Sequence, residues 1–241
     1  MKKLSLVALV FVAVLAAAPS FAQDYAAVVA APDRAEADRQ TDQRRDPVKL
    51  LAFTGVKTGM TVLDMGAGGG YSTELMARAV GPGGKVYGQD YETGARAKER
   101  FEARMKTDAM KNVTALARPF DDPLPADVKN LDLITFFFFY HDTTYMTVDR
   151  ATMNRKLFAA LKPGGFLVIA DHSAKAGAGT SMGKTLHRIE ESTLRSEVEA
   201  AGFKLVGEGD WLRHPEDTRE ERIFGSKTPV DEFVLKFRKP H

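Results

Sequence analysis

The chain has 241 residues, with 34 lysines and arginines against 32 aspartates and glutamates, a formal net charge of +2. Hydrophobic residues make up 44% of the chain and charged residues 27%, which are ordinary globular values and exclude an intrinsically disordered chain. A chain of this length suits one large α/β domain.

The first 22 residues have the pattern of a secretory signal peptide. Lys2 and Lys3 give a charged start, residues 4–18 form a nearly unbroken apolar run, and small residues precede an expected cleavage after Ala22. The apolar run is shorter than the roughly 20 residues that span a membrane. We therefore expect export to the periplasm, with no stable membrane anchor after cleavage.

Cleavage would change the charge balance of the chain. It removes Lys2 and Lys3 but no acid, which leaves equal numbers of basic and acidic side chains. With no basic excess to grip a phosphate backbone, we expect no nucleic-acid partner. The chain also contains no cysteine, which excludes lipid attachment at the cleavage site, disulfides and thiolate metal sites.

Beyond the signal, the sequence predicts an N-terminal helical cap, residues 23–60, and a domain of alternating strands and helices, residues 61–241. Within the cap, residues 33–46 are highly charged and favour a helix, and Pro47 opens a second helical stretch. We expect strands at 61–65, 85–89, 113–117, 131–139, 166–170, 203–207 and 232–238, and helices at 71–80, 95–107, 149–161 and 190–201. This alternation predicts a mostly parallel sheet with helices on both faces. The charged tract 211–229 is expected to be an exposed excursion.

The strongest functional signal lies where the first predicted strand becomes a helix, in the run Asp64-Met65-Gly66-Ala67-Gly68-Gly69-Gly70-Tyr71. Glycines let a backbone turn sharply and let a ligand approach closely. A P-loop is excluded because no lysine follows the glycines. A dinucleotide fingerprint fails because its sixth position is Tyr71 counted from Gly66 and Thr73 counted from Gly68. The run does match D-x-G-x-G-x-G, and so it resembles the first motif of class I S-adenosylmethionine-dependent methyltransferases.

The resemblance continues along the chain. Residues 85–90 are similar to the second strand of that family, which ends in an acid, here Asp90. Its carboxylate can accept both hydrogen bonds of a ribose diol, although NAD enzymes place an acid similarly. Residues 118–125 resemble the loop after the third strand, where an acid faces the adenine amino group. Asp121 is the first choice for this acid and Asp122 the alternative.

The resemblance implies S-adenosyl-L-methionine as the cofactor. The first motif would hold its methionine part, the acid after the second strand its ribose and the acid after the third strand its adenine. Tyr71 either stacks near the cofactor or only starts the helix. The predicted cofactor contacts are Asp64, Gly66, Ala67, Gly68, Gly69, Gly70, Tyr71, Asp90, Tyr91, Phe120 and Asp121.

A narrower resemblance, to a bacterial group of exported predicted methyltransferases without an established substrate, rests on short polar motifs. These are Asp38-Arg39, Asp42, Arg45-Asp46-Pro47, Tyr140-His141-Asp142, Asp171-His172 and Leu186-His187-Arg188-Ile189. Asp38, Asp42 and Arg45 recur at three- and four-residue spacing and share one side of the first cap helix. That helix either lies over the mouth of the cofactor site as a lid or presents a solvated face.

Polar residues also follow the fourth and fifth predicted strands, where substrate-facing groups are expected. Methyl transfer from a sulfonium is an in-line displacement, so the protein mainly supplies alignment, and a hydroxyl or carboxyl acceptor also needs a base. Histidine titrates in the right range for this role. The predicted catalytic or substrate-binding residues are His141, Tyr140, Asp142, His172 and His187. The alternative is that they are ordinary caps and loop residues.

This region also contains plausible zinc or manganese ligands, namely His141, Asp142, Asp171, His172 and His187. They come from separate loops and show no local ligand-spacing motif. The sequence therefore gives no ground to expect a metal.

Together these features predict a Rossmann-like class I methyltransferase fold, a seven-stranded mainly parallel sheet with an antiparallel last strand and helices on both faces. The expected activity is methyl transfer to a small-molecule acceptor. The cofactor is made in the cytoplasm and the signal directs the chain outward, so the alternative is an exported, non-catalytic nucleoside- or metabolite-binding protein on the same scaffold.

Overall fold

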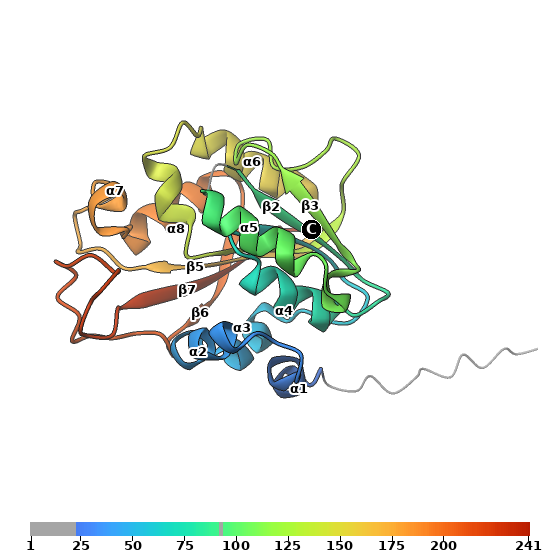
Figure 1. The fold of residues 1–241 in the computed structure, drawn as a ribbon. Coiled ribbons are helices and arrows are strands. Elements are labelled where there is room, and N and C mark those ends of the chain that lie inside the picture. Colours follow the sequence, from blue (N-terminus) through green and yellow to red (C-terminus); the bar gives the residue numbers. More distant parts are fainter. Residues whose placement is uncertain (1–22, 92–93) are drawn as a thin grey trace, which may run out of the picture.

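A single seven-stranded sheet runs through the domain in the order β3-β2-β1-β4-β5-β7-β6 (Figure 1). Neighbours from β3 to β5 are parallel, whereas β7 is antiparallel to both β5 and β6. This confirms the predicted mainly parallel sheet with an antiparallel last strand. The strands are β1 Thr61–Met65, β2 Lys85–Asp90, β3 Val113–Ala117, β4 Leu131–Phe137, β5 Leu161–His172, β6 Lys204–Gly209 and β7 Glu232–Arg238.

This computed structural model describes residues 23–91 and 94–241, so the predicted signal peptide lies outside the described residues. Within those two ranges, no helix is both long enough and apolar enough to cross a membrane. The helices are α1 Tyr25–Ala30, α2 Glu36–Arg45, α3 Pro47–Thr54, α4 Tyr71–Val80, α5 Ala95–Arg104, α6 Arg150–Ala160, α7 Gly183–Leu186 and α8 Glu191–Ala200, with 3-10 turns η1 Asp108–Met110 and η2 Tyr140–Thr144.

The sheet is covered on both faces by apolar helix surfaces. One buried cluster joins the sheet to α3, α4 and α5, and includes Leu51, Leu75 and Phe101. The other joins it to α6 and α8, and includes Leu157 and Leu194. In Figure 1, α4 and α5 lie in front of the sheet, and the blue helices α1–α3 lie together below α4. The layers place the carboxyl ends of β1, β2 and β4 at one edge, where an α/β sheet binds ligands.

Several predicted boundaries move for local reasons. The strand predicted at 131–139 ends at Phe137 because Phe138 adopts a left-handed φ of 59°. The strand predicted at 166–170 is longer, since β5 already pairs with β4 at Leu161. The helix predicted from residue 33 begins at Glu36, and α1, capped by the Asp24 side chain, was not predicted.

The packing of the second cluster supports a stability prediction. Phe203 is fully buried, and its ring lies 5.1 Å from that of Phe158. Phe203→Ala should lower the free energy of unfolding by about 3–5 kcal/mol, because it leaves a cavity in a close-packed core. Phe224→Ala is the control, since Phe224 is 66% exposed, and should change it by less than about 0.5 kcal/mol. Urea denaturation measures both, and similar effects of the two variants would contradict this packing.

Candidate functional site

The glycine run forms a tight turn between β1 and α4. Gly66, Gly68 and Gly70 have φ values of 63°, 53° and 83°, in the left-handed region that favours glycine. A Cβ on Gly70 would lie 2.9 Å from Cδ of Arg104, so this position must stay small. A Cβ on Gly68 would meet only the Gly66 carbonyl, at 3.9 Å. The turn is therefore packed on the α5 side and open at Gly68.

Asp64, predicted to contact the cofactor, lies beneath this turn instead. Its carboxylate is fully buried and accepts hydrogen bonds from the hydroxyls of Ser72, Thr73 and Thr135, at 2.7–2.8 Å. Burial raises the pKa of Asp64, and the three hydroxyls oppose that rise. These bonds tie β1 to the first turn of α4 and to β4. Asp64 therefore supports the turn and is not among the residues that line the cavity beside it, so its contact with the cofactor stays a prediction.

Gln89, which the sequence reasoning missed, fixes the other side of the turn. Its buried side chain accepts from the Gly66 amide at 3.2 Å and donates to the Arg118 carbonyl at 2.6 Å. Its backbone carbonyl accepts from the Ala67 amide at 2.8 Å. Gln89 therefore links the turn after β1 to the loop after β3. The sequence signal that could have identified Gln89 is an uncharged polar residue at the end of a predicted buried strand.

Helix α2 lies across a cavity of about 670 Å³ that opens beside the glycine turn. The cavity is lined by Gly66–Gly69 on one side, by Tyr71 and by α2 residues that include Asp38 and Arg45. Of the two arrangements expected for this helix, the structure shows the one that covers the turn. Asp38, Asp42 and Arg45 do share the side of α2 that faces the domain.

Two ion-pair clusters hold α2 in this place. Arg104 of α5 donates to Asp38 at 2.6 and 3.0 Å, to Glu74 of α4, and to the Gly69 carbonyl at 3.0 Å. Arg34 donates to Asp42 at 2.6 and 2.9 Å.

The second cluster also engages Tyr71, whose hydroxyl donates to Asp42 at 2.7 Å. Burial disfavours the charge of Asp42, but hydrogen bonds from Arg34 and Tyr71 outweigh it and hold the pKa of Asp42 below its usual range. Tyr71 therefore does more than start α4: its ring lines the cavity and its hydroxyl anchors α2.

Arg45 differs from these arginines because it has no carboxylate partner. Its Cζ lies 4.3 Å from the centre of the Phe138 ring and 5.2 Å from that of Tyr71. Among the described residues, it makes no hydrogen bond or ion pair, and its buried Nε has no hydrogen-bond partner. Burial and the neighbouring Arg44 lower the pKa of Arg45 to about 10, so it stays charged at neutral pH. The cavity thus contains a guanidinium that is free to bind an anion.

The predicted nucleoside contacts fall into two groups. Asp90 ends β2, and its Oδ1 accepts from the amide of Tyr91, whose side chain is 38% exposed. Both residues line a second cavity, of about 540 Å³, between the ends of β2 and β3 and α5. Phe120 does not reach either cavity: it is fully buried, with its ring stacked on Phe139 at 5.1 Å. Phe120 is therefore a core residue, which corrects its assignment to the cofactor.

The two acids after β3 have different partners. Asp122 pairs with Arg118 and with Lys156, which lies 2.6 Å away. Asp121 accepts only a 3.3 Å hydrogen bond from the Asp149 amide among the interactions of the described chain. Asp121, the first choice from the sequence, is thus the acid with more capacity left for a ligand.

His141, His172 and His187 form one cluster, as their positions after neighbouring strands predicted. The His141 ring centre lies 5.5 Å from that of His172 and 5.4 Å from that of His187. Nδ1 of His141 lies 2.6 Å from Oδ1 of Asp171, and Nδ1 of His187 lies 3.1 Å from Oδ1 of Asp142. The structure therefore assembles the polar residues after β4 and β5 into a common group.

The protonation of these rings limits what each can do. Burial opposes the charge of His141, but the carboxylates of Asp171 and Asp142 outweigh it and raise the pKa of His141 to about 10. Burial lowers the pKa of His172, although Nδ1 lies 3.0 Å from Oε1 of Glu232 in ion-pair geometry. At neutral pH, His141 therefore carries a proton and cannot accept one, which argues against its predicted use as a general base.

Tyr140, also predicted at the reaction end, points away from the other polar residues. It is fully buried, donates its hydroxyl proton to Glu197 at 2.8 Å and accepts a hydrogen bond from Asn154 at 2.8 Å. These partners belong to α8 and α6, on the face of the sheet that the second apolar cluster fills. Tyr140 is therefore a core residue and not a catalytic candidate.

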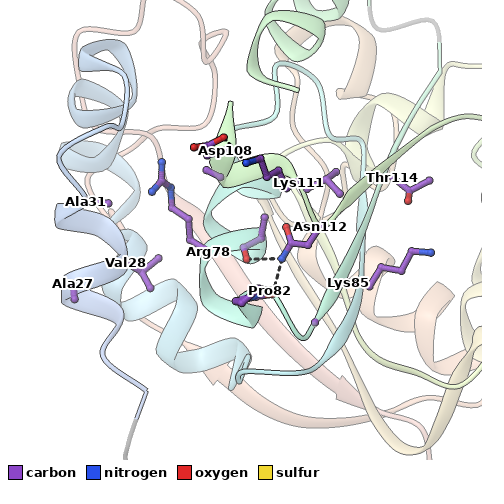
Figure 2. Close-up of a pocket in the computed structure, with 15 residues that line it drawn as sticks. Ala27, Val28, Ala31, Arg78, Pro82, Lys85, Asp108, Lys111, Asn112 and Thr114 are labelled. Atoms are coloured by element: carbon purple, nitrogen blue, oxygen red, sulfur yellow. Dashed lines mark hydrogen bonds and ion pairs between the residues drawn. The ribbon is translucent and has the colours of Figure 1, made fainter. Parts of the chain in front are cut away.

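A larger cavity, of about 760 Å³, lies at the opposite edge of the sheet (Figure 2). It is bounded by Ala27 and Val28 of α1, by Arg78 and by Asn112, whose amide donates to the carbonyls of Ala77 and Gly81. It adjoins Lys85, the first residue of β2, so it lies at the amino ends of the strands. Ligands of α/β sheets bind at the carboxyl ends, so we do not assign function to this cavity.

Residues 56–211 match the model of a family described as a methyltransferase domain. The chain belongs to this methyltransferase family. Demethylmenaquinone methyltransferase of Lactococcus lactis is 31% identical over 130 residues, which cover 52% of this chain and 47% of that protein. The chain spans about half the length of the curated relatives it matches.

Solved structures share the methyltransferase fold. A SAM-dependent methyltransferase from Aquifex aeolicus has a TM-score of 0.61 and 20% identity, covering 89% of this chain and 98% of that one. Fibrillarin from Aeropyrum pernix, in complex with natively bound S-adenosyl-L-methionine, has a TM-score of 0.51 and 16% identity, covering 79% and 74%. The expected fold agrees with these neighbours.

The attachment of α2 can be tested through Arg104. Its side chain is 14% exposed and faces Asp38 and Glu74, which are 10% and 6% exposed. Arg104→Met should lower the free energy of unfolding by about 3–5 kcal/mol, because it leaves the buried carboxylate of Asp38 without its cation. Glu74 keeps its ion pair with Arg78. It should also speed hydrogen exchange of the α2 amides.

The matched control is Lys98→Met in the same helix. Lys98 is 77% exposed and lies 3.9 Å from Glu102, and such surface pairs contribute little. This control should change stability by less than about 0.5 kcal/mol and leave α2 exchange as in the wild type. Wild-type exchange of α2 in Arg104→Met would show that the ion pairs do not hold the helix.

Proposed function

We propose that this chain binds S-adenosyl-L-methionine beside the glycine turn and transfers the methyl group to a small-molecule acceptor. The observation that carries the proposal is Arg45, a charged guanidinium without a carboxylate partner, facing the same cavity as Gly66–Gly69. An amino-acid carboxylate suits a guanidinium because the pair can form two parallel charge-assisted hydrogen bonds. The family membership of the chain supports the reaction class.

The residues around the cavity suit the rest of such a ligand. The acids Asp38, Asp42 and Glu74 already bind arginines, so half-buried Arg45 remains available for an anionic group. Arg100 also lines the cavity without a carboxylate partner among the described residues, but its side chain is exposed. The open position at Gly68 lets a ligand approach the backbone closely. A volume of about 670 Å³ lies within the range of small-molecule pockets, roughly 300–1,000 Å³.

The nucleoside part would extend along the same sheet edge. Asp90 at the end of β2 offers carboxylate oxygens to a ribose diol, and Asp121 after β3 offers an acceptor to an exocyclic amine. When bound, the cofactor supplies an activated methyl group on a sulfonium. The chain itself then has to align the acceptor, exclude water and keep nearby protons in place.

The histidine cluster suits the acceptor side of this reaction. His172 stacks on Phe138, with 5.2 Å between the ring centres, and Phe138 also lines the cofactor cavity. The cluster thus adjoins the cavity through a shared aromatic ring. Protonated His141 can orient an oxygen of the acceptor as a hydrogen-bond donor. A small-molecule acceptor also agrees with the demethylmenaquinone named for the curated relatives. Export through residues 1–22 remains part of the proposal.

A ligand comparison tests the role of Arg45. Arg45→Gln should weaken S-adenosylhomocysteine binding by about 1.5–3 kcal/mol, the range for a hydrogen bond to a charged group. Binding of 5′-methylthioadenosine, which lacks the amino acid part, should stay within about threefold of wild type, because its atoms do not reach Arg45. Calorimetric titration of each variant with both ligands measures the difference.

The control is Arg39→Gln, which removes another arginine of α2 that donates to the Ala31 carbonyl. It should leave both affinities nearly unchanged. Equal loss for the two ligands in Arg45→Gln would mean that Arg45 acts only through folding. No loss for S-adenosylhomocysteine would refute the carboxylate assignment.

The glycine turn makes a separate prediction. Gly68→Val should reduce S-adenosylhomocysteine affinity at least 100-fold, because its side chain enters ligand space and its φ of 53° disfavours a β-branched residue. Gly59→Val is matched for backbone strain, with a φ of 84° and open space around its Cβ, but lies before β1. Gly59→Val should still bind S-adenosylhomocysteine. If both variants lose this binding, backbone strain alone explains the loss.

A further inference from the structure

We propose that His141, Asp142 and His187 form a binding site for a divalent cation with the ligand preference of Zn²⁺. Oδ1 of Asp142 lies 3.1 Å from Nε2 of His141 and 3.1 Å from Nδ1 of His187. The three ligand atoms all lie within 4.8 Å of one another. In a tetrahedral zinc site with bonds of about 2.0–2.2 Å, ligand atoms are roughly 3.2–3.6 Å apart. The side chains therefore need to move little to surround an ion.

The first independent observation is the state of the His141 ring. It is 2% exposed, and its Nε2 lies 3.1 Å from Oδ1 of Asp142 as an ion pair but makes no hydrogen bond among the described residues. A buried nitrogen without a hydrogen bond is rare in native proteins. A cation between His141 and Asp142 would give that nitrogen a ligand.

The second observation is the carboxylate behind His141. Asp171 is fully buried, and its Oδ1 lies 2.6 Å from Nδ1 of His141. The backbone amides of His141 and His172 donate to the same carboxylate at 2.8 Å. A carboxylate on the far nitrogen fixes the tautomer and orientation of a metal-binding imidazole. Asp171 thus presents Nε2 of His141 toward Asp142 and His187.

His187 is placed by an unusual backbone conformation. It caps the end of α7 with a φ of 56°, a left-handed conformation that non-glycine residues seldom adopt, although histidine does so more often than most. Its ring packs at 4.9 Å against the exposed Phe224. Strained residues of this kind concentrate at functional sites. Here the strained backbone aims Nδ1 at the carboxylate that His141 also faces.

Two neighbours must adjust when the ion binds. Nη2 of Arg222 lies 3.4 Å from Nε2 of His187, and both would be donors once Nδ1 binds a metal. Arg222 is exposed and can turn away. The hydroxyl of Tyr145, 2.5 Å from Oδ1 of Asp142, must release that oxygen or share it. Binding also has to displace the proton of His141, as metal binding to histidine generally does.

The ligand set determines the class of ion. Two imidazoles and one carboxylate, with no thiolate, suit Zn²⁺ and related first-row ions better than Mg²⁺ or Ca²⁺, which prefer oxygen ligands. Three protein ligands leave a position for water. If the proposed methyl transfer holds, that position faces the acceptor side of the site, and the bound ion replaces protonated His141 as the group that contacts the acceptor oxygen.

The experiment is metal binding by the full chain, which does not depend on methyl transfer. The purified protein is stripped with a chelator, dialysed and titrated calorimetrically with ZnCl₂, and bound zinc is counted after desalting. We expect one zinc per chain. His187→Asn keeps a residue that tolerates a positive φ and should lose zinc affinity at least 100-fold. Asp171→Asn should lose about 10- to 100-fold, the usual effect of removing such a carboxylate.

The matched control is His214→Gln, because the His214 side chain is 36% exposed and pairs only with Glu216 among the described residues. It should bind zinc like the wild type. Arg222→Ala keeps every ligand and removes the competing donor, so it should bind zinc at least as tightly as the wild type. This variant tests the site even if His187→Asn fails to fold. The proposal is wrong if the wild type binds no stoichiometric zinc or if folded His187→Asn binds zinc equally well. The three side chains then form only an imidazolium–carboxylate cluster.

Discussion

The candidate site depends on the charge pairing that fastens α2 to the glycine turn. Asp38 and Asp42 of α2 are drawn against the domain by Arg104 and Arg34, and Arg104 also binds the Gly69 carbonyl. Partly buried carboxylates are stable there only while those cations remain. The acids around the cavity are already paired with these arginines, so Arg45 has no carboxylate partner. A cap helix that looks like a solvated surface in sequence therefore sets both the wall and the charge of the cavity.

The residues around the glycine turn have two roles: some support the turn, and others are positioned to contact a ligand. Asp64 and Gln89 do not line the cavity, but they hold the strand end, the helix start and the loop after β3 in one arrangement. The open backbone at Gly68 is the part that can approach a ligand. A motif acid can thus be essential to a binding loop while remaining fully buried beneath it.

The sequence predicts the architecture well because local patterns determine most of it. The ends of β1, β3, β7 and α4 agree with the predicted bounds, since apolar runs are interrupted there by glycines and charged residues. Phe120 and Tyr140 were wrongly placed because their positions beside a motif do not reveal that their rings turn into the core. Adjacency along the chain fixes where a backbone passes, and packing between distant elements decides where a side chain points.

The absence of a carboxylate partner for Arg45 also could not be predicted from the sequence. It follows from the pairing of Asp38 with Arg104, 66 residues away in the chain, and of Tyr71 with Asp42. The grouping of the three histidines, by contrast, was predictable, because the carboxyl ends of neighbouring parallel strands meet at one sheet edge. The sequence could not reveal that Nε2 of His141 lacks a hydrogen bond or that His187 adopts a positive φ.

The most direct test of the account is a crystal structure of the chain with S-adenosylhomocysteine. The account predicts the ligand between α2 and the glycine turn, with its carboxylate on Arg45, its ribose at Asp90 and its sulfur on the side of Phe138. The cavity beside Arg78 and Asn112 is the alternative binding place for this ligand (Figure 2). Ligand bound there, or at the sheet edge without any contact to Arg45, would contradict the central claim.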